Sequence, residues 1–139
     1  MTTNNMKQDI SISMSNLNYL DGAVSQIHGL TTFIVGNDNH KVIPAGMLLN
    51  LLWTASERIE VILKDCNSMY FGEIPEEQLK FEQLLIQAKS VLDALRIDNH
   101  VGSFSPDTVS NVIWLADSLL EDAIKELDKM PTRPDEQAA

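Results

Sequence analysis

The chain has 139 residues, a formal net charge of −10 at pH 7 and a hydrophobic fraction of 44%. This length suits a single domain, and the hydrophobic fraction is that of a globular protein rather than a disordered one. Because an acidic protein is repelled by nucleic-acid phosphates and by anionic membrane surfaces, direct binding to either is not expected.

The sequence indicates a cytoplasmic protein. No apolar run approaches the roughly 20 residues that a membrane-spanning helix needs. The polar stretch 1–14 lacks the basic and apolar regions of a signal peptide. The single cysteine, Cys66, cannot form an internal disulfide and falls at an apolar position. A buried, unreactive thiol in a reducing compartment is therefore expected.

Residues 1–15 are predicted to form a flexible arm, as polar termini usually do. Its alternating apolar residues, Ile10, Ile12 and Met14, also fit a short strand or a packed clip. The first helix is predicted over residues 16–35, because its apolar residues recur every three or four positions. They are Leu17, Leu20, Val24, Ile27, Thr31 and Ile34.

Proline marks the start of each of the three later helices, where its fixed backbone angle suits a first turn. The second helix is predicted over residues 44–71, the third from Pro75 to residue 95, and the fourth over residues 105–130. The tail 131–139 carries too little apolar surface to fold, so it is expected to be disordered.

The second half of the chain repeats the first at an offset of about 61 residues. Residues 50–55 (Asn-Leu-Leu-Trp-Thr-Ala) align with residues 111–116 (Asn-Val-Ile-Trp-Leu-Ala). The apolar seam of the second helix aligns with that of the fourth, and the seam of the first aligns with that of the third. The seam of the second helix is Leu48, Leu52, Ala55, Ile59, Ile62, Cys66 and Met69. That of the fourth is Val109, Ile113, Ala116, Leu120, Ala123, Leu127 and Met130. That of the third is Phe81, Leu85, Ala88, Leu92 and Leu95.

We therefore predict an all-α protein, an antiparallel up-down-up-down four-helix bundle over residues 16–130 that is made of two similar helical hairpins. Alternating steps of four and three residues favour helix packing at about +20°. Short connections make successive helices antiparallel neighbours. The sequence leaves open whether the bundle closes within one chain or pairs with a second copy as a homodimer.

Candidate metal ligands lie in the loops after the first and third helices, where Asp-Asn-His occurs twice. Asp38 and His40 lie in the first of these loops, and Asp98 and His100 lie in the second. In the predicted bundle both loops are at the same end, and two Asp with two His would suit zinc or another divalent ion. Asp and Asn are also common turn residues for backbone reasons, and a duplication would copy them, so no cofactor is predicted.

The sequence offers no convincing catalytic set. His28 lies beside the first apolar seam, which predicts a partly buried or exposed helical histidine. No His with an Asp or Asn is spaced to act as base and orienter for Cys66. No glycine-rich phosphate loop is present either. These observations favour a protein that is not an enzyme.

Two tryptophans are the first candidates for partner binding. If Leu52 and Ile113 occupy heptad position a, Trp53 and Trp114 fall at position b, off the main seam. An aromatic residue at a seam edge is typical of protein interfaces. The alternative is that each indole covers a flank of the bundle, which would keep a large apolar face out of water.

The acidic residues of the fourth helix are the second candidates. Residues 73–139 carry 6 basic and 14 acidic side chains (−8), against 4 and 6 (−2) in residues 1–72. Asp117 and Glu121 belong to this acidic group and lie within two turns of Trp114. A solvated helix face explains such residues as well as a binding surface does, and Glu121 also has Lys125 one turn away.

Three functional hypotheses follow. The first is a small acidic module that binds another protein or itself and regulates it without catalytic activity. The second is an acidic inhibitor, possibly from a mobile element, that binds a nucleic-acid-binding protein by mimicking DNA. The third is a helical protein that binds a divalent metal through the two Asp-Asn-His loops.

Overall fold

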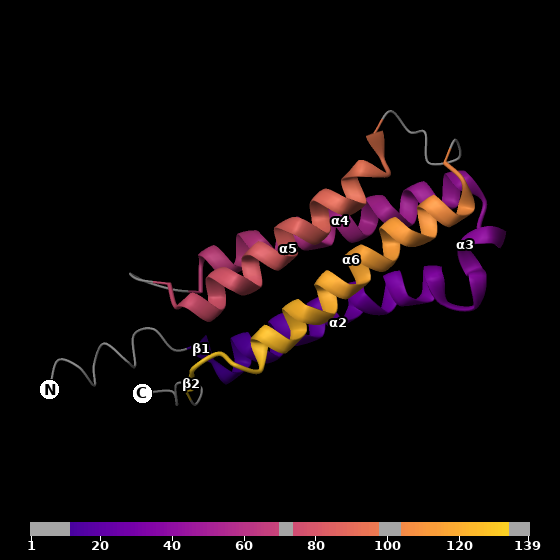
Figure 1. Cartoon of the computed structure of the whole chain (residues 1–139). Coiled ribbons are helices and arrows are strands. Elements are labelled where there is room, and N and C mark those ends of the chain that lie inside the picture. The colour runs from indigo at the N-terminus through magenta and orange to yellow at the C-terminus, as the bar shows by residue number, and fades with distance from the viewer. Residues whose placement is uncertain (1–11, 70–73, 98–103, 134–139) are drawn as a thin grey trace, which may run out of the picture.

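The computed structural model describes residues 12–69, 74–97 and 104–133, and four long helices make up most of them. These helices are α2 (Met14–Val35), α4 (Ala45–Asn67), α5 (Glu76–Ala94) and α6 (Pro106–Leu127). They lie lengthwise beside one another (Figure 1). The predicted all-α class is confirmed. The largest difference from the predicted boundaries is at the end of α4, which stops at Asn67 rather than near residue 71.

Local sequence explains where the helices begin and turn. The Ser13 hydroxyl accepts a hydrogen bond from the backbone N–H of Asn16, and the Ser105 hydroxyl accepts one from Thr108. Each satisfies a backbone donor that would otherwise be unpaired in a first helical turn. After α2, Asn37 and Asp38 adopt left-handed backbone angles (φ 53° and 58°), which these residue types tolerate well. This turn leads through η1 (Gly36–Asp38) into the short helix α3 (Asn39–Val42).

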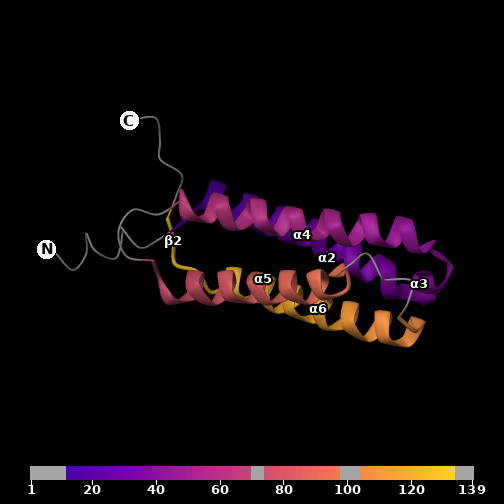
Figure 2. The same ribbon diagram turned by 90° about the horizontal axis from the view of Figure 1, so that it is seen from above.

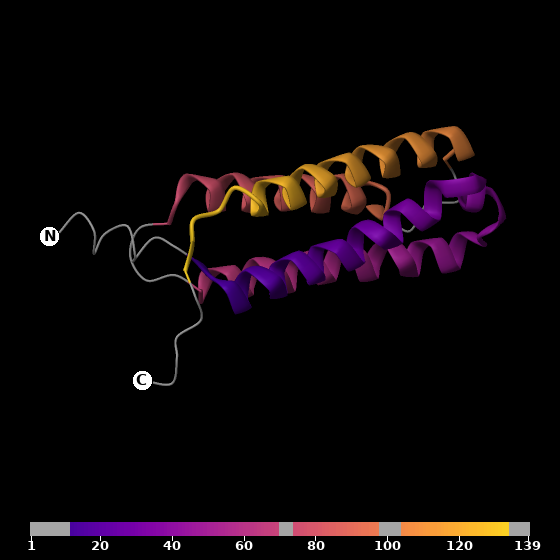
Figure 3. The same cartoon turned by 90° about the horizontal axis from the view of Figure 1, so that it is seen from below.

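The four long helices share one core. α2 packs against α4 and α6, and α5 packs against the same two helices, so each long helix has two main neighbours. Figures 2 and 3 show α4 beside α2, and α5 beside α6. The predicted seams supply the core: every residue of the four seams is buried except Leu17 and Met69, which are half-buried.

A short strand pair joins the two ends of the described chain. β1 (Ile12–Ser13) pairs in parallel with β2 (Thr132–Arg133), and the Ile12 N–H donates to the Pro131 carbonyl at 2.8 Å. The Ile12 side chain is 1% exposed, so its burial holds this end of the chain against the helices. The short strand that the alternating apolar residues allowed is present at Ile12–Ser13, and residues 132–133 of the predicted tail pair with it. Residues 1–11 and 134–139, most of the predicted arm and tail, lie outside the described residues.

No helix in the described part of the chain combines the length and the apolar character needed to cross a bilayer. The helices are instead amphipathic, with their apolar sides turned to the shared core.

Truncating the aligned core residues Leu52 and Ile113 tests this packing. Both side chains are fully buried, so Leu52→Ala and Ile113→Ala should each lower the free energy of unfolding by about 2–5 kcal/mol. Urea denaturation followed by circular dichroism measures the loss. The exposed Leu79→Ala is the control and should cost less than about 0.5 kcal/mol. Losses below about 1 kcal/mol at both core positions would contradict the seam assignment.

Candidate functional site

The two tryptophans have similar exposure but different surroundings. Trp53, 47% exposed, donates a hydrogen bond from its indole N–H to Glu57, one turn further along α4. The guanidinium carbon of Arg96, just beyond α5, lies 4.2 Å from the centre of the Trp53 ring. A cation over the face of an indole is attracted by the ring electrons. Trp53 is therefore partly covered on the side where α4 meets α5.

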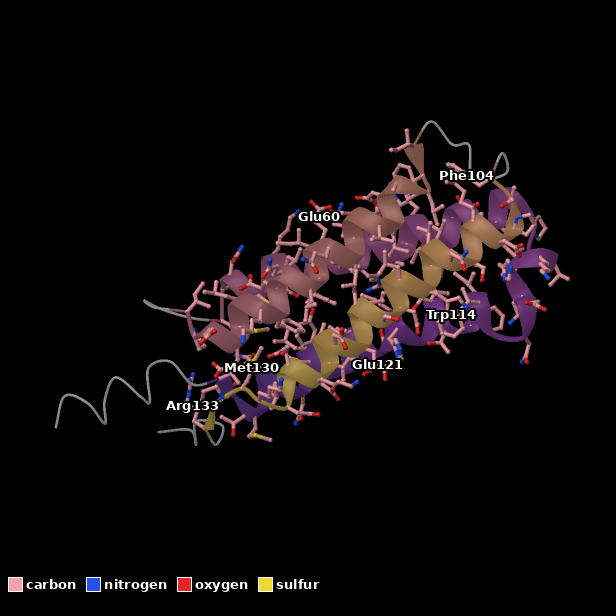
Figure 4. All side chains as sticks on the ribbon, in the orientation of Figure 1. Glu60, Phe104, Trp114, Glu121, Met130 and Arg133 are labelled. Carbon is pink, nitrogen blue, oxygen red and sulfur yellow. The ribbon has the colours of Figure 1, made fainter. Side chains whose placement is uncertain are left out.

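Trp114, 48% exposed, lies on the side of α6 where α2 passes (Figure 4). Within the described residues its ring makes no hydrogen bond and no cation contact. Because α4–α5 and α6–α2 are different helix pairs, the two tryptophans do not form one continuous patch. A single flat interface could not use both of them at once.

Asp117, a predicted partner-binding residue, is an internal group that joins α6 to α2. It is 5% exposed, and its Oδ1 accepts hydrogen bonds from the hydroxyls of Thr31 and Thr32, each at 2.7 Å. Its Oδ2 lies 3.4 Å from Nε2 of His28. A carboxylate held in this way is satisfied from within the chain. Glu121, by contrast, is exposed and lies 3.8 Å from Lys125.

A second carboxylate, Asp93, joins α5 to α4. Its Oδ1 accepts a hydrogen bond from the Ser56 hydroxyl at 2.6 Å, and its Oδ2 lies 2.7 Å from Lys89 Nζ. Arg96 also pairs with Oδ1. Partial burial by itself would raise the pKa of Asp93, but the hydrogen bonds from Lys89 and Ser56 and the charges of Lys89 and Arg96 outweigh it and lower the pKa below its usual 3.8.

The two carboxylate clusters occupy positions 61 residues apart, with the acid and the hydroxyl exchanged. Thr32 of α2 aligns with Asp93 of α5, and Asp117 of α6 aligns with Ser56 of α4. In each cluster a hydroxyl donates to a carboxylate across two packed helices. The 61-residue alignment already places polar residues at these positions, but their pairing depends on which helices become neighbours, which spacing alone does not give.

The two candidate metal ligands within the described residues, Asp38 and His40, have different surroundings. The Asp38 carboxylate is exposed and lies 3.8 Å from Lys41, whereas His40 is buried. Asp98 and His100 lie outside the described residues. Among residues 12–69, 74–97 and 104–133, no group of three or more His, Cys, Asp or Glu side chains could hold a metal ion.

Among the predicted partner-binding residues, Trp53, Trp114 and Glu121 are exposed and Asp117 is buried, and Trp114 and Glu121 lie on one flank of α6 (Figure 4). The clusters around Asp117 and Asp93 serve to hold helices together, and His28 is half-buried beside the first of them. Comparison of the chain with protein-family models, with curated proteins and with solved structures found no match.

Cys66 should resist thiol reagents in the folded protein. Its side chain is buried, and burial raises the pKa of the thiol to about 12, so almost no reactive thiolate forms at pH 8. We expect a disulfide reagent that releases a coloured thiolate to react with native protein many times more slowly than with protein in denaturant. Equal rates in both conditions would contradict the burial of Cys66.

Replacing Asp93 with Asn tests the α4–α5 cluster through its pH dependence. Because the folded pKa is lowered, the ionised carboxylate stabilises the fold above the ordinary pKa of 3.8, and this stabilisation is lost as the pH falls through the folded pKa. The Tm of Asp93→Asn should fall below that of wild type at pH 7, and the gap should narrow below pH 3.8. The exposed Asp122→Asn controls for the loss of one charge. A Tm difference between wild type and Asp93→Asn that stays constant from pH 7 to below pH 3.8 would contradict a stabilising role of the ionised Asp93 carboxylate.

Proposed function

We propose that the chain is an antiparallel up-down-up-down bundle built from two copies of one helical hairpin. In support, residues 49–67 and 110–128 have the same degree of burial at every aligned position except Arg58, which is exposed, and Leu119, which is half-buried. Exchanging the two hairpins turns the α4–α5 contact into the α6–α2 contact, and both of these helix pairs are packed together. The β1–β2 pair at one end of the helices and α3 at the other agree with this topology (Figure 1).

We further propose that the protein is a cytoplasmic interaction module without catalytic activity, and that another protein docks on the α6 flank centred on Trp114. The observation that carries this proposal is that two aligned tryptophans with nearly equal exposure differ in their contacts. Arg96 and Glu57 contact the Trp53 indole, whereas no such contact is made by Trp114 within the described residues. Tryptophan is among the residues most often responsible for binding energy at interfaces, so a half-exposed one whose indole has no cation or hydrogen-bond partner in the described residues is a suitable anchor.

Acidic residues on the same side of α6 as Trp114 suggest that the partner carries basic residues. Asp107 and Glu121 lie two helical turns before and after Trp114, and residues spaced by seven share a helix face. Glu121 and Trp114 lie along one edge of α6 (Figure 4). An apolar pocket flanked by basic residues would complement this arrangement.

An apolar anchor is favoured over a DNA-mimicking surface. Glu121 pairs with Lys125, and Glu126 lies 3.2 Å from Lys129, so two of the carboxylates of this region have a cation beside them. A DNA mimic depends on an uninterrupted acidic surface, because its basic partner is attracted by charge. These pairs reduce the charge that such a partner would meet.

The duplication provides a matched control for the test. Tagged wild type, Trp114→Ala and Trp53→Ala would be used to capture partners from a lysate of the source cells. The affinity of a purified, captured partner would then be measured by calorimetry. Trp114→Ala should weaken binding by at least about 30-fold, which corresponds to 2 kcal/mol, whereas Trp53→Ala should weaken it by less than about threefold.

Circular dichroism would establish that both variants are folded. Equal weakening by the two substitutions would contradict docking at Trp114. Binding that survives Trp114→Ala but is abolished by moderate salt would favour the acidic-inhibitor hypothesis instead. Sedimentation of wild type that shows a dimer dispersed by Trp114→Ala would identify a second copy of the chain as the partner.

A further inference from the structure

We propose that the groove between α2 and α4 binds a small anionic molecule with an aromatic or branched apolar body, and that Arg58 pairs with its anionic group. This inference is independent of the Trp114 flank, because it concerns a different pair of helices. It rests on the shape of the groove, on the reason the groove exists and on the charge at its edge.

The groove has a volume of about 460 Å³, within the range of small-molecule sites. Its floor is formed by the buried side chains of Ile27, Ala55 and Ile62, and Leu30 and Val61 also line it. Figure 2 shows the two helices that enclose it lying side by side. Apolar surface of this kind gains free energy when a ligand removes it from water.

The groove is larger than the hollow at the aligned place in the second hairpin, which has a volume of about 240 Å³, because the first hairpin has smaller side chains there. Gly22 and Ala23 of α2 align with Gln83 and Leu84 of α5, and Leu84 packs against the core. A Cβ atom added at Gly22 would meet no atom within 4 Å, so the space beside it is open. Accordingly, α5 and α6 pack closely along their length, whereas α2 and α4 have far fewer contacts.

A comparison of α6 with α4 gives a further difference between the hairpins. Leu119 of α6, which packs against the core, aligns with Arg58 of α4, which lines the groove. An apolar side chain in one hairpin is thus replaced in the other by a guanidinium beside an apolar floor. The corresponding hollow of the second hairpin is lined by charges of both signs, from Lys80 and Glu126.

Arg58 is an available cation in a strongly acidic protein. Within the described residues it makes no hydrogen bond and no ion pair, whereas Lys64 on the same helix lies 3.7 Å from Glu60. The Asp65 carboxylate accepts a hydrogen bond from the hydroxyl of Tyr19, which lines the groove, and in the described part of the chain it forms no ion pair with Arg58. The planar guanidinium group matches the geometry of a carboxylate, sulfonate or phosphate, so the free charge selects an anionic ligand.

Two fluorescent probes that differ by one charged group test the proposal. Anilinonaphthalene sulfonate has an aromatic body with a sulfonate, and N-phenylnaphthylamine has the same body without it. Native protein should bind the sulfonate probe saturably at one site. Arg58→Leu, which introduces the residue of the aligned position, should weaken the sulfonate probe at least about tenfold and the neutral probe less than about threefold.

Filling the groove tests the site itself. Gly22→Leu places a side chain in open space and should weaken both probes at least about tenfold, while Gln83→Leu, at the aligned position of the second hairpin, should change neither by more than about threefold. Thermal unfolding would verify that each variant remains cooperatively folded. Trp114→Ala should leave both probes bound.

Four results would overturn the proposal. One is the absence of saturable binding by native protein. The second is equal weakening by Gly22→Leu and Gln83→Leu, and the third is equal weakening of both probes by Arg58→Leu. The fourth is loss of the probes in Trp114→Ala, which would place them on the α6 flank and leave the docking proposal for that flank standing.

Discussion

The burial of four apolar helix faces in one shared core is the constraint on which the rest of the structure depends. Each long helix has a single apolar seam, and a hairpin of two such helices would leave much of that surface in water. In proteins, most of the stability of a helix comes from the tertiary packing of its apolar face. Fully buried residues from three different helices, such as Leu52, Leu85 and Ile113, illustrate how the hairpins complete one another.

Apolar packing alone does not determine which helices become neighbours, since leucine and isoleucine seams fit together in several ways. The clusters around Asp117, which is buried, and Asp93, which is half-buried, are more selective, because a carboxylate that is taken out of water without its donors carries a penalty. Thr32 can reach Asp117 only when α2 lies against α6, and Ser56 can reach Asp93 only when α4 lies against α5. These hydrogen bonds thus fix the contacts between the hairpins and leave the contacts within each hairpin free to differ.

The helices and their seams were predictable because both follow from a period that is visible in any one stretch of chain. Features that need two distant stretches were missed. Asp117 resembles a surface acid, and its burial is explained by its partners on α2, which are the two threonine hydroxyls and His28. The pairing of Ile12 needs Pro131 and Thr132 at the far end of the chain. The heptad position of Trp53 and Trp114 predicted partial exposure for both, but their difference arises from Arg96.

Arg96 aligns with Val35, and like the other mismatches that distinguish the two hairpins, this one lies outside the apolar seams. Arg58 aligns with a leucine of the second hairpin, and Gly22 aligns with a glutamine. None of these residues belongs to the apolar seams, where a change of size would create a cavity or a clash within a core that both hairpins share. Differences are tolerated at the seam edges, because a side chain there can turn toward water or lie along the surface. In a protein with two similar halves, the edges of the seams are therefore where a groove, or a half-exposed aromatic residue without a cation partner, can arise without cost to the fold. The α2–α4 groove and the Trp114 flank both lie there.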